Sequence, residues 1–314
     1  MKKIVWMLAL ILVLSACAPA APKAEATAAP SEPASNLSGR LIYGVSGSDG
    51  KYHLELIDLE NKETLTYKNK GNHIAPSFSP DGQRFVFAGD GDGTYDLYLS
   101  DLSGGNVLRF TVFSAQESEP RWSPDSASIA YQSNGFGDYD IYVIPAAGGE
   151  PLRLTTGDSG ETQPAWSPDS QRIAFVSDRD GDFEIYVMGA DGSNVSQLTS
   201  NSVADSTPAW SPDGKSIAFL SKRSAHYVLY VMDTDGDNEK TLVSGNAAVH
   251  SPAWSPDGKL LAFISDLPGK SSILVLDISS GKTSEVLSSE SKLAGLTWGA
   301  ATPPADSTTQ KATN

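Results

Sequence analysis

Cysteine is nearly absent from this 314-residue sequence, in which Cys17 is the single copy. A lone cysteine excludes a disulfide within the chain and any metal site built from several cysteines. Basic residues are also scarce, with 23 Lys and Arg against 38 Asp and Glu and a net charge of −15. Such a surface repels the phosphates of DNA and RNA, so nucleic acid is not an expected partner.

Long apolar runs are absent as well. Lys2 and Lys3 are followed by a run of only 11 apolar residues, from Ile4 to Leu14. A membrane-spanning helix needs about 20, so residues 1–16 are predicted to be a secretory signal peptide. The next residues complete Leu-Ser-Ala-Cys, which resembles the lipobox of bacterial lipoproteins. The resemblance implies that Cys17 carries the lipid that anchors an extracytoplasmic protein to the membrane, which with Ala18 next would be the outer membrane of a two-membrane cell.

The segments at the two ends of the sequence are poor in large apolar side chains. Residues 17–37 are mainly Ala, Pro, Glu, Ser and Thr, and no large apolar side chain follows the cysteine until Leu37. Such a stretch cannot bury enough surface to fold, so it is predicted to be a disordered tether. The last 14 residues, 301–314, have a similar composition and are predicted to be a disordered tail.

The middle of the sequence is a repeat with a period of 44 residues. One aromatic slot marks it, at Phe78, Trp122, Trp166, Trp210, Trp254 and Trp298. Each unit contains four short apolar runs bounded by Gly, Pro, Asp or Ser, which is the pattern of four antiparallel strands. A period of this length without helix signals predicts a propeller, with one unit forming one blade.

Two positions inside the unit predict how the blades pack. The second run carries a small residue or Val beside an aromatic residue, for example Ala174 beside Phe175, and is apolar on both faces. A strand of this kind is covered on both sides, as stacked blades require.

The first copy begins at Arg40 and lacks its first strand, whereas Leu293 to Ala300 supply one at the other end. We therefore expect an all-β, six-bladed propeller over residues 38–300, with four strands per blade, closed by the C-terminal strand.

The repeated P-x-W-S-P-D-G and the following I-Y-V-M-D-x-D-G resemble the TolB-type, WD-like propeller repeats of bacterial envelope proteins. Five copies keep S-P-D at a constant spacing, and the resemblance covers residues 38–300. It implies a six-bladed propeller lipoprotein whose partner is an envelope protein or peptide. TolB carries an α/β domain ahead of its propeller, and the tether of 17–37 stands in its place here, so the role of TolB itself does not follow.

Carboxylates concentrate in the loops between the second and third strands of three units. They form a candidate binding face made of Asp90, Asp92, Asp96, Asp138, Asp140, Asp178, Asp180, Asp182 and Glu184. Clustered carboxylates are the ligands that Ca²⁺ prefers. However, the glycine and glutamate positions of an EF-hand loop are missing, and Asp and Gly are also ordinary turn residues. We expect no metal or other cofactor, and Ca²⁺ stays the one alternative.

A second candidate site lies at the mouth of the central channel. The residues before or near the inner-strand proline are small or polar and are expected to line it, namely Ala75, Glu119, Gln163, Thr207 and Ser251. His73 and His250 precede inner strands at similar offsets and could lie near the same mouth. Gly157-Asp158-Ser159-Gly160 echoes a serine-peptidase motif, but nothing else of that family is present, and these four common turn residues are interpreted as a loop between blades.

Two functions from different classes are compatible with these patterns. We expect a monomeric, non-catalytic scaffold that binds an envelope protein or peptide through its acidic face. The alternative is a carbohydrate-active or other hydrolase or lyase whose site at the channel mouth uses His73 or His250. No G-x-S-x-G nucleophile motif is present in the sequence.

Overall fold

A computed structural model of the protein describes residues 37–68, 70–91 and 93–301. The predicted signal peptide, Cys17 and nearly all of the predicted tether and tail lie outside these residues. Every regular element within them is a β-strand. No helix in this part of the chain is long and apolar enough to cross a membrane.

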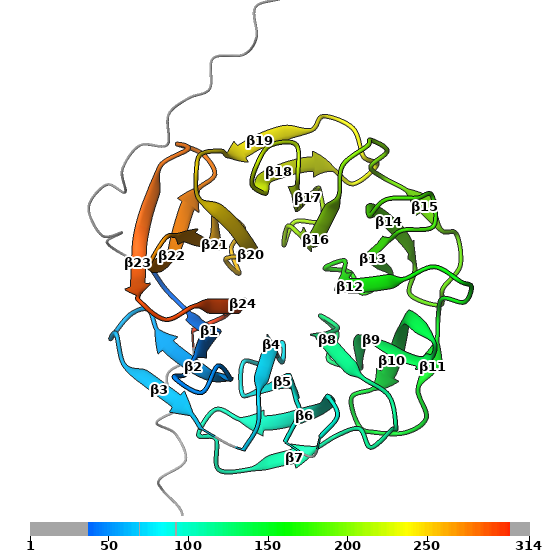
Figure 1. Ribbon diagram of the computed structural model, residues 1–314, viewed down its shortest axis with the longest axis horizontal. Coiled ribbons are helices and arrows are strands. Elements are labelled where there is room, and N and C mark those ends of the chain that lie inside the picture. The colour runs from blue at the N-terminus through cyan, green and yellow to red at the C-terminus, as the bar shows by residue number, and fades with distance from the viewer. Residues whose placement is uncertain (1–36, 69, 92, 302–314) are drawn as a thin grey trace, which may run out of the picture.

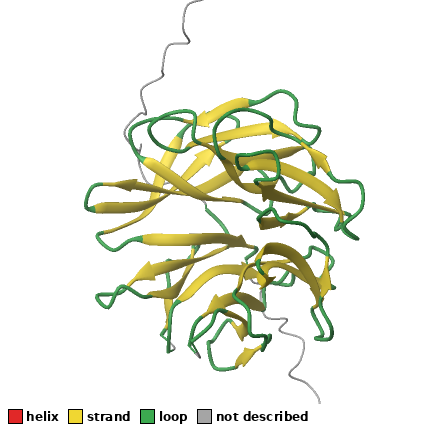
Figure 2. Ribbon diagram, turned by 45° about the vertical axis from the view of Figure 1, so that its right-hand side comes forward, coloured by secondary structure: helices red, strands yellow, loops and turns green. Residues whose placement is uncertain are grey.

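The strands form six sheets of four antiparallel strands, arranged as blades around a common centre (Figure 1). Figure 2 shows the same ring turned by 45°, with loops joining the strands at both ends of the blades. Blade 1 contains β24 (Leu293–Gly299), β1 (Arg40–Ser46), β2 (Tyr52–Asp58) and β3 (Thr64–Tyr67); blade 2 contains β4 (His73–Phe78), β5 (Arg84–Gly89), β6 (Asp96–Asp101) and β7 (Val107–Arg109); blade 3 contains β8 (Glu117–Trp122), β9 (Ser128–Phe136), β10 (Asp138–Pro145) and β11 (Leu152–Arg153). Blade 4 contains β12 (Glu161–Trp166), β13 (Arg172–Ser177), β14 (Glu184–Gly189) and β15 (Ser196–Gln197); blade 5 contains β16 (Asp205–Trp210), β17 (Ser216–Ser221), β18 (Val228–Asp233) and β19 (Lys240–Val243); blade 6 contains β20 (Ala248–Trp254), β21 (Leu260–Leu267), β22 (Lys270–Asp277) and β23 (Thr283–Ser289).

The S-P-D turn joins the first and second strands of blades 2 to 6. In blade 4, the Ser167 hydroxyl donates to the Asp169 carboxylate at 2.5 Å and accepts the Arg172 N–H at 2.9 Å. The hydroxyl holds the pKa of Asp169 below its usual value, so the aspartate stays charged and the turn stays closed. The same serine–aspartate bond recurs in the four other turns at 2.5–2.7 Å. The repeated tripeptide is therefore explained by one local hydrogen-bond network.

The second strand of each blade is the most deeply buried. Ala174 and Phe175 in β13 are both 0% exposed, although alternate residues of a strand point to opposite faces. Ala174 packs in one cluster with Phe219 of the next blade, and Phe175 packs with Ala130 of the preceding one. Small and aromatic residues thus alternate across the blade junctions, as the sequence predicts.

Blade 1 closes the ring. Its inner strand β24 comes from the C-terminal end of the propeller and pairs antiparallel with β1, with Leu41 opposite Trp298. The Trp298 indole N–H also donates to the Ser38 carbonyl oxygen at 3.1 Å. Leu37, assigned by composition to the tether, is buried in the same cluster as Trp298. The prediction of six blades closed by the C-terminal strand is confirmed.

Truncation of the chain after Ser291 tests how much the closure contributes. The truncation removes β24 and leaves the apolar sides of β1 and of blades 2 and 6 uncovered. Loss of a buried Trp alone typically costs about 3–5 kcal/mol, which is a large share of a domain's stability. We expect an aggregation-prone protein in size-exclusion chromatography and a melting temperature lower by many degrees. A control truncated after Ala301 keeps every strand and should elute and melt like the intact protein; a soluble Ser291 truncation with unchanged melting would contradict the closure.

Candidate functional site

The inner strands of the six blades surround a central cavity of about 720 Å³. Its wall contains two kinds of residue at two levels. Prolines of the five S-P-D turns and the aromatic residues that end the inner strands form one level: Pro80, Pro124, Pro168, Pro212 and Pro256, with Phe78, Trp122, Trp166, Trp210, Trp254 and Trp298. Mainly small and polar residues from the middle of the inner strands form the other. The cavity therefore reaches from the middle of the ring to the face that carries the S-P-D turns.

The polar level of the cavity is a ring of β-bulges. In every blade the pairing of the inner strand with its neighbour shifts register around one residue. These residues have φ between 48° and 57°: Ala75, Glu119, Gln163, Thr207, Ser251 and Gly295. This left-handed region favours glycine, and a non-glycine residue there costs roughly 1–2 kcal/mol. Backbone strain of this kind tends to gather at binding and catalytic sites.

The structure thus brings the five predicted channel residues together in one cavity wall. Their bulged backbone directs several N–H groups sideways to the preceding blade. The Gln163 N–H donates to the Gln132 side chain at 2.9 Å, and the Thr207 N–H donates to the Gln163 side chain at 2.8 Å. The Gly295 N–H donates to the Ser251 hydroxyl at 3.2 Å. Polar side chains of the wall are therefore held in place by backbone groups of the next blade.

Few charges face the cavity. The Arg121 guanidinium donates to the Glu119 carboxylate at 2.8 Å, so these two charges neutralise each other. His250 also lines the cavity, and its Nε2 lies 3.7 Å from the Asp266 carboxylate. Burial lowers the pKa of His250 against the opposite effect of Asp266, which favours the neutral ring. The cavity wall is consequently close to neutral overall.

His73 is placed differently from His250. It is 4% exposed, and its ring packs edge-on against Phe87 with the centroids 5.0 Å apart. Burial lowers its pKa as well. The structure therefore does not bring the two histidines together in the way that a shared catalytic site would require.

The predicted acidic face is smaller than the sequence suggests. Three of its members are buried and belong to the interior: Asp96, Asp140 and Glu184, which are 0%, 2% and 1% exposed. The reason is that each lies within the first three residues of the third strand of its blade, at the junction with the next blade. Asp138 and Asp180 are exposed, whereas Asp90, Asp178 and Asp182 are half-buried in loops. Asp92 lies outside the described residues.

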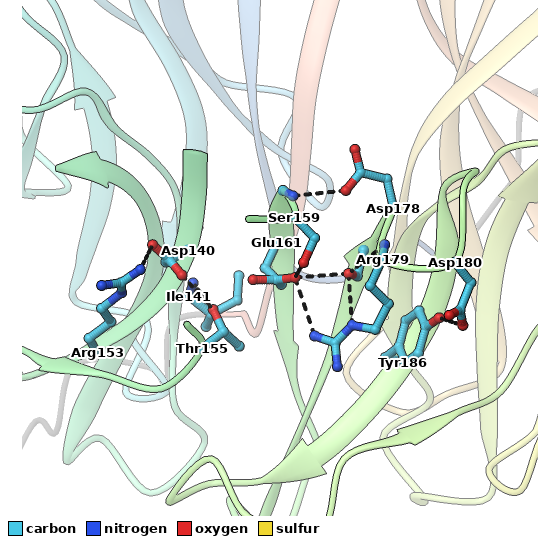
Figure 3. A network of polar contacts seen from close by, with 12 residues as sticks. Asp140, Ile141, Arg153, Thr155, Ser159, Glu161, Asp178, Arg179, Asp180 and Tyr186 are labelled. Atoms are coloured by element: carbon cyan, nitrogen blue, oxygen red, sulfur yellow. Dashed lines mark hydrogen bonds and ion pairs between the residues drawn. The ribbon is translucent and has the colours of Figure 1, made fainter. Parts of the chain in front are cut away.

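The buried acids form a repeated junction, which Figure 3 shows between blades 3 and 4. Asp140 forms an ion pair with Arg153 at 2.7 Å and accepts a hydrogen bond from the Thr155 hydroxyl at 3.3 Å. The same hydroxyl accepts the Ile141 N–H at 2.9 Å. Thr155 therefore ties the beginning of β10 to the chain that leads into β12.

Glu161 is the acid that blade 4 contributes to this junction. Its Oε1 accepts hydrogen bonds from the hydroxyls of Ser159 at 2.6 Å and Ser177 at 2.9 Å. The Arg179 guanidinium lies 3.2 Å from the same oxygen (Figure 3). Because Glu161 is 1% exposed, its charge depends on these donors rather than on water.

The same triad of acid, threonine and acid occurs at three consecutive junctions. Its members are Asp96, Thr111 and Glu117 between blades 2 and 3, Asp140, Thr155 and Glu161 between blades 3 and 4, and Glu184, Thr199 and Asp205 between blades 4 and 5. Burial raises the pKa of Asp140 and of Glu184. Among the described residues no group of three or more His, Cys, Asp or Glu side chains could hold a metal ion.

The TolB beta propeller domain family matches residues 31–163 and 158–226, which is more than half of the chain. The chain belongs to this family. Its structure is similar to TolB from Acinetobacter baumannii, with 22% identity and a TM-score of 0.74 over 83% of this chain and 66% of that one. A protein from Agrobacterium tumefaciens that is provisionally assigned as TolB has 22% identity and a TM-score of 0.68, covering 82% of this chain and 91% of that one.

More distant structures share the fold of this TolB-type propeller. An oligogalacturonate lyase from Vibrio parahaemolyticus is 15% identical with a TM-score of 0.53, and covers 81% of this chain and 75% of the lyase. Identities this low show the fold alone. The chain spans 66% of the length of the Acinetobacter TolB. No curated protein sequence matches the chain.

Sequence reasoning missed the acid junctions of this TolB-type propeller, although a signal was present. Subtracting the period of 44 places Asp96, Asp140 and Glu184 in one slot, each directly before a buried apolar residue such as Leu97. A loop carboxylate has no reason to keep that register, whereas a residue paired in a strand does. Thr111 and Glu117 also have counterparts of the same type at intervals of 44 residues.

Glu117 allows a test of the junction by pH. It is 0% exposed; its Oε2 accepts a hydrogen bond from Thr111 at 2.7 Å, and its Oε1 has no hydrogen-bond partner among the described residues. Burial raises the pKa of Glu117 to about 7. The hydrogen bond from Thr111 lowers this pKa, and the charge of nearby Asp96 raises it. An acid with a raised pKa in the folded state binds protons more tightly there, so its stabilisation is complete below about pH 4.5 and is lost as pH rises through 7.

We therefore expect Glu117→Gln to gain stability relative to the wild type as pH rises from 5 to 8, by roughly 1–3 kcal/mol. Urea unfolding of both proteins at the two pH values measures this difference. Glu150→Gln, at an exposed position, is the matched control and should show no such gain. Equal pH dependence in the wild type and Glu117→Gln would show that Glu117 does not titrate in this range.

Proposed function

We propose that the protein is a non-catalytic scaffold of the bacterial cell envelope that binds a peptide segment of a partner protein in its central cavity. The family supports the general class, because a TolB-type propeller is a protein-binding fold. The observation that carries the proposal is the ring of bulges, in which five non-glycine residues with positive φ face one cavity. The bulges link neighbouring blades through their N–H groups, and they also gather these five residues around one cavity.

The two levels of the cavity match the two needs of a bound peptide. Prolines and aromatic residues on the S-P-D side offer apolar surface for side chains, and Tyr, Trp and similar groups are typical of binding sites. Thr207, Ser251 and Gln163 in the bulge ring offer polar groups to the peptide backbone. The volume of about 720 Å³ lies within the range of ligand pockets, and it accommodates several residues of an extended chain.

The cavity is a better candidate than the acidic loops. Among the members of the predicted acidic face that the structure describes, only Asp138 and Asp180 are exposed. Asp180 accepts a hydrogen bond from the Tyr186 hydroxyl, and Asp178 accepts one from the Gly160 N–H at 2.8 Å. Carboxylates that already stabilise their own loops have less to offer a partner. A neutral cavity also fits a peptide whose recognition depends on shape more than on charge.

Blocking the cavity tests the proposal. Glu119 and Ser251 lie on blades 3 and 6, which are opposite each other in the ring. Replacing both by Trp puts two indole rings into the cavity, so we expect the proteins crosslinked to the propeller in native envelopes to be lost. The double variant Glu150→Trp and Ser200→Trp, at exposed positions, is the matched control. Both variants should melt within a few degrees of the wild type.

Two further arms separate the alternatives. Reversing the charges of Asp178, Asp180 and Asp182 should leave the crosslinked proteins in place; their loss there, with retention in the Glu119→Trp and Ser251→Trp variant, would move the binding site to the loops. A panel of oligosaccharide and peptide substrates should show no turnover. Turnover that disappears in His250→Ala would replace the scaffold proposal by an enzymatic one.

The membrane anchor is a separate part of the proposal and rests on Cys17, which lies outside the described residues. Lipid on this cysteine would place the propeller at the membrane surface, and stable anchoring requires more than one acyl chain. We expect Cys17→Ser to move the protein from the membrane fraction to the soluble extracytoplasmic fraction. Fractionation followed by immunoblotting measures the change, and a Cys17→Ser protein that stays with the membrane would contradict lipid anchoring.

A further inference from the structure

Four blades contain a stacked pair of aromatic rings between their second and third strands. The ring centroids are 5.5–5.8 Å apart in the pairs Phe87–Tyr98, Tyr131–Tyr142, Phe175–Tyr186 and Phe219–Tyr230. In blades 4 and 5 an arginine covers the tyrosine, with the Arg179 and Arg223 guanidinium groups 4.7 Å and 4.6 Å from the ring centroids. The fold therefore repeats one slot that is shaped for a phenol ring.

Blade 6 lacks the second ring of this pair. Phe263 occupies the first position and is 0% exposed, but its partner on β22 is Leu274. One period after Arg223 the chain has Leu267, so no guanidinium covers the slot. The junction with blade 5 also changes, because Val243 and Val249 occupy the positions of the threonine and the acid at the three polar junctions. At the junction of blades 5 and 6, shorter or apolar side chains therefore replace the larger or polar side chains of the other blades.

These substitutions leave a pocket of about 380 Å³ between blades 5 and 6. Its apolar wall includes Tyr227, Val243, Val249, Phe263, Leu267 and Leu274. A polar edge is formed by Lys270, whose Nζ lies 2.8 Å from Glu285, and by the Ser272 hydroxyl, which donates to the same carboxylate at 3.1 Å. An apolar body with a few converging polar groups is the ordinary composition of a small-ligand site.

We propose that this pocket binds a small aromatic ligand, a single ring with one small polar substituent, that packs against the Leu274 side chain beside Phe263. The occupant follows from the repeat itself, because four other blades fill the same slot with a phenol ring from their own tyrosine. A ring in the pocket fills space that the tyrosine rings fill in those blades and that the shorter Leu274 side chain leaves open. Its polar substituent reaches the Lys270 and Glu285 edge, which is half-exposed. The site is separate from the central cavity and does not depend on the peptide-binding proposal.

Binding of p-cresol, the side-chain analogue of tyrosine, tests the site in the full-length protein. Ligand-detected NMR should show saturable binding with a dissociation constant on the order of 1 mM, as expected for a fragment of this size. Leu274→Tyr refills the slot from within and should weaken binding at least tenfold. The matched control, Leu108→Tyr at a position that is 61% exposed, should bind like the wild type. Absence of saturable binding, or equal binding to Leu274→Tyr and Leu108→Tyr, would overturn the proposal.

A second variant keeps the test decisive if Leu274→Tyr folds poorly. Leu267 is 47% exposed, so Leu267→Arg should fold normally and cover the pocket as Arg179 and Arg223 cover the rings of blades 4 and 5. It should also weaken p-cresol binding, and unchanged affinity would count against the site. N-acetyltyrosine amide distinguishes the source of the ring: tighter binding than p-cresol indicates a tyrosine side chain of a peptide, and weaker binding indicates a free small molecule.

Discussion

The structure depends on the pairing of β24 with β1. Each blade is apolar on both faces, and the second strands at its centre, such as β13 with Ala174 and Phe175, have no solvent-facing side. Such sheets are stable only when every face is covered by a neighbour, and in a row of blades the two end faces would stay open. Closing the ring with a strand from the far end of the propeller covers both. The central cavity is a consequence, because six inner strands held at the ring's radius cannot meet at the centre.

Some positions of the repeat carry the same type of residue in nearly every blade, whereas others differ from blade to blade. The S-P-D serine and aspartate recur because they close the same turn in five blades. The small and aromatic residues of the second strand and the aromatic end of the first strand recur because they pack against the neighbouring blades. The junction slots differ. Two acids and a threonine whose hydroxyl donates to one of them occupy three junctions, whereas Val243 and Val249 occupy another and open a pocket there. A repeat protein can therefore acquire local sites by changing one copy while its neighbours preserve the ring.

The candidate sites of this TolB-type propeller are consequently built from backbone geometry as much as from side chains. In the central cavity the bulges place Gln163, Thr207 and Ser251 in the wall, and the side chains of Gln163 and Ser251 each accept an N–H group of the next blade. The cavity holds few unbalanced charges, although the protein as a whole has a net charge of −15. Overall acidity thus describes the outer surface and several buried junctions, and it does not describe the cavity that we propose as the binding site.

The sequence by itself determined the blade count, the order of strands and the closing strand, because a period of 44 residues, a first copy that lacks one strand and one extra strand at the other end leave one simple arrangement. It also placed the five channel residues in a common slot. Only the tertiary structure decided that Asp96, Asp140 and Glu184 are buried, that His73 packs against Phe87 away from His250, and that Leu274 leaves an open slot. The physical reason is that a repeat period records what each blade does within itself, whereas burial, charge pairing and cavities arise between blades, where residues far apart in sequence meet.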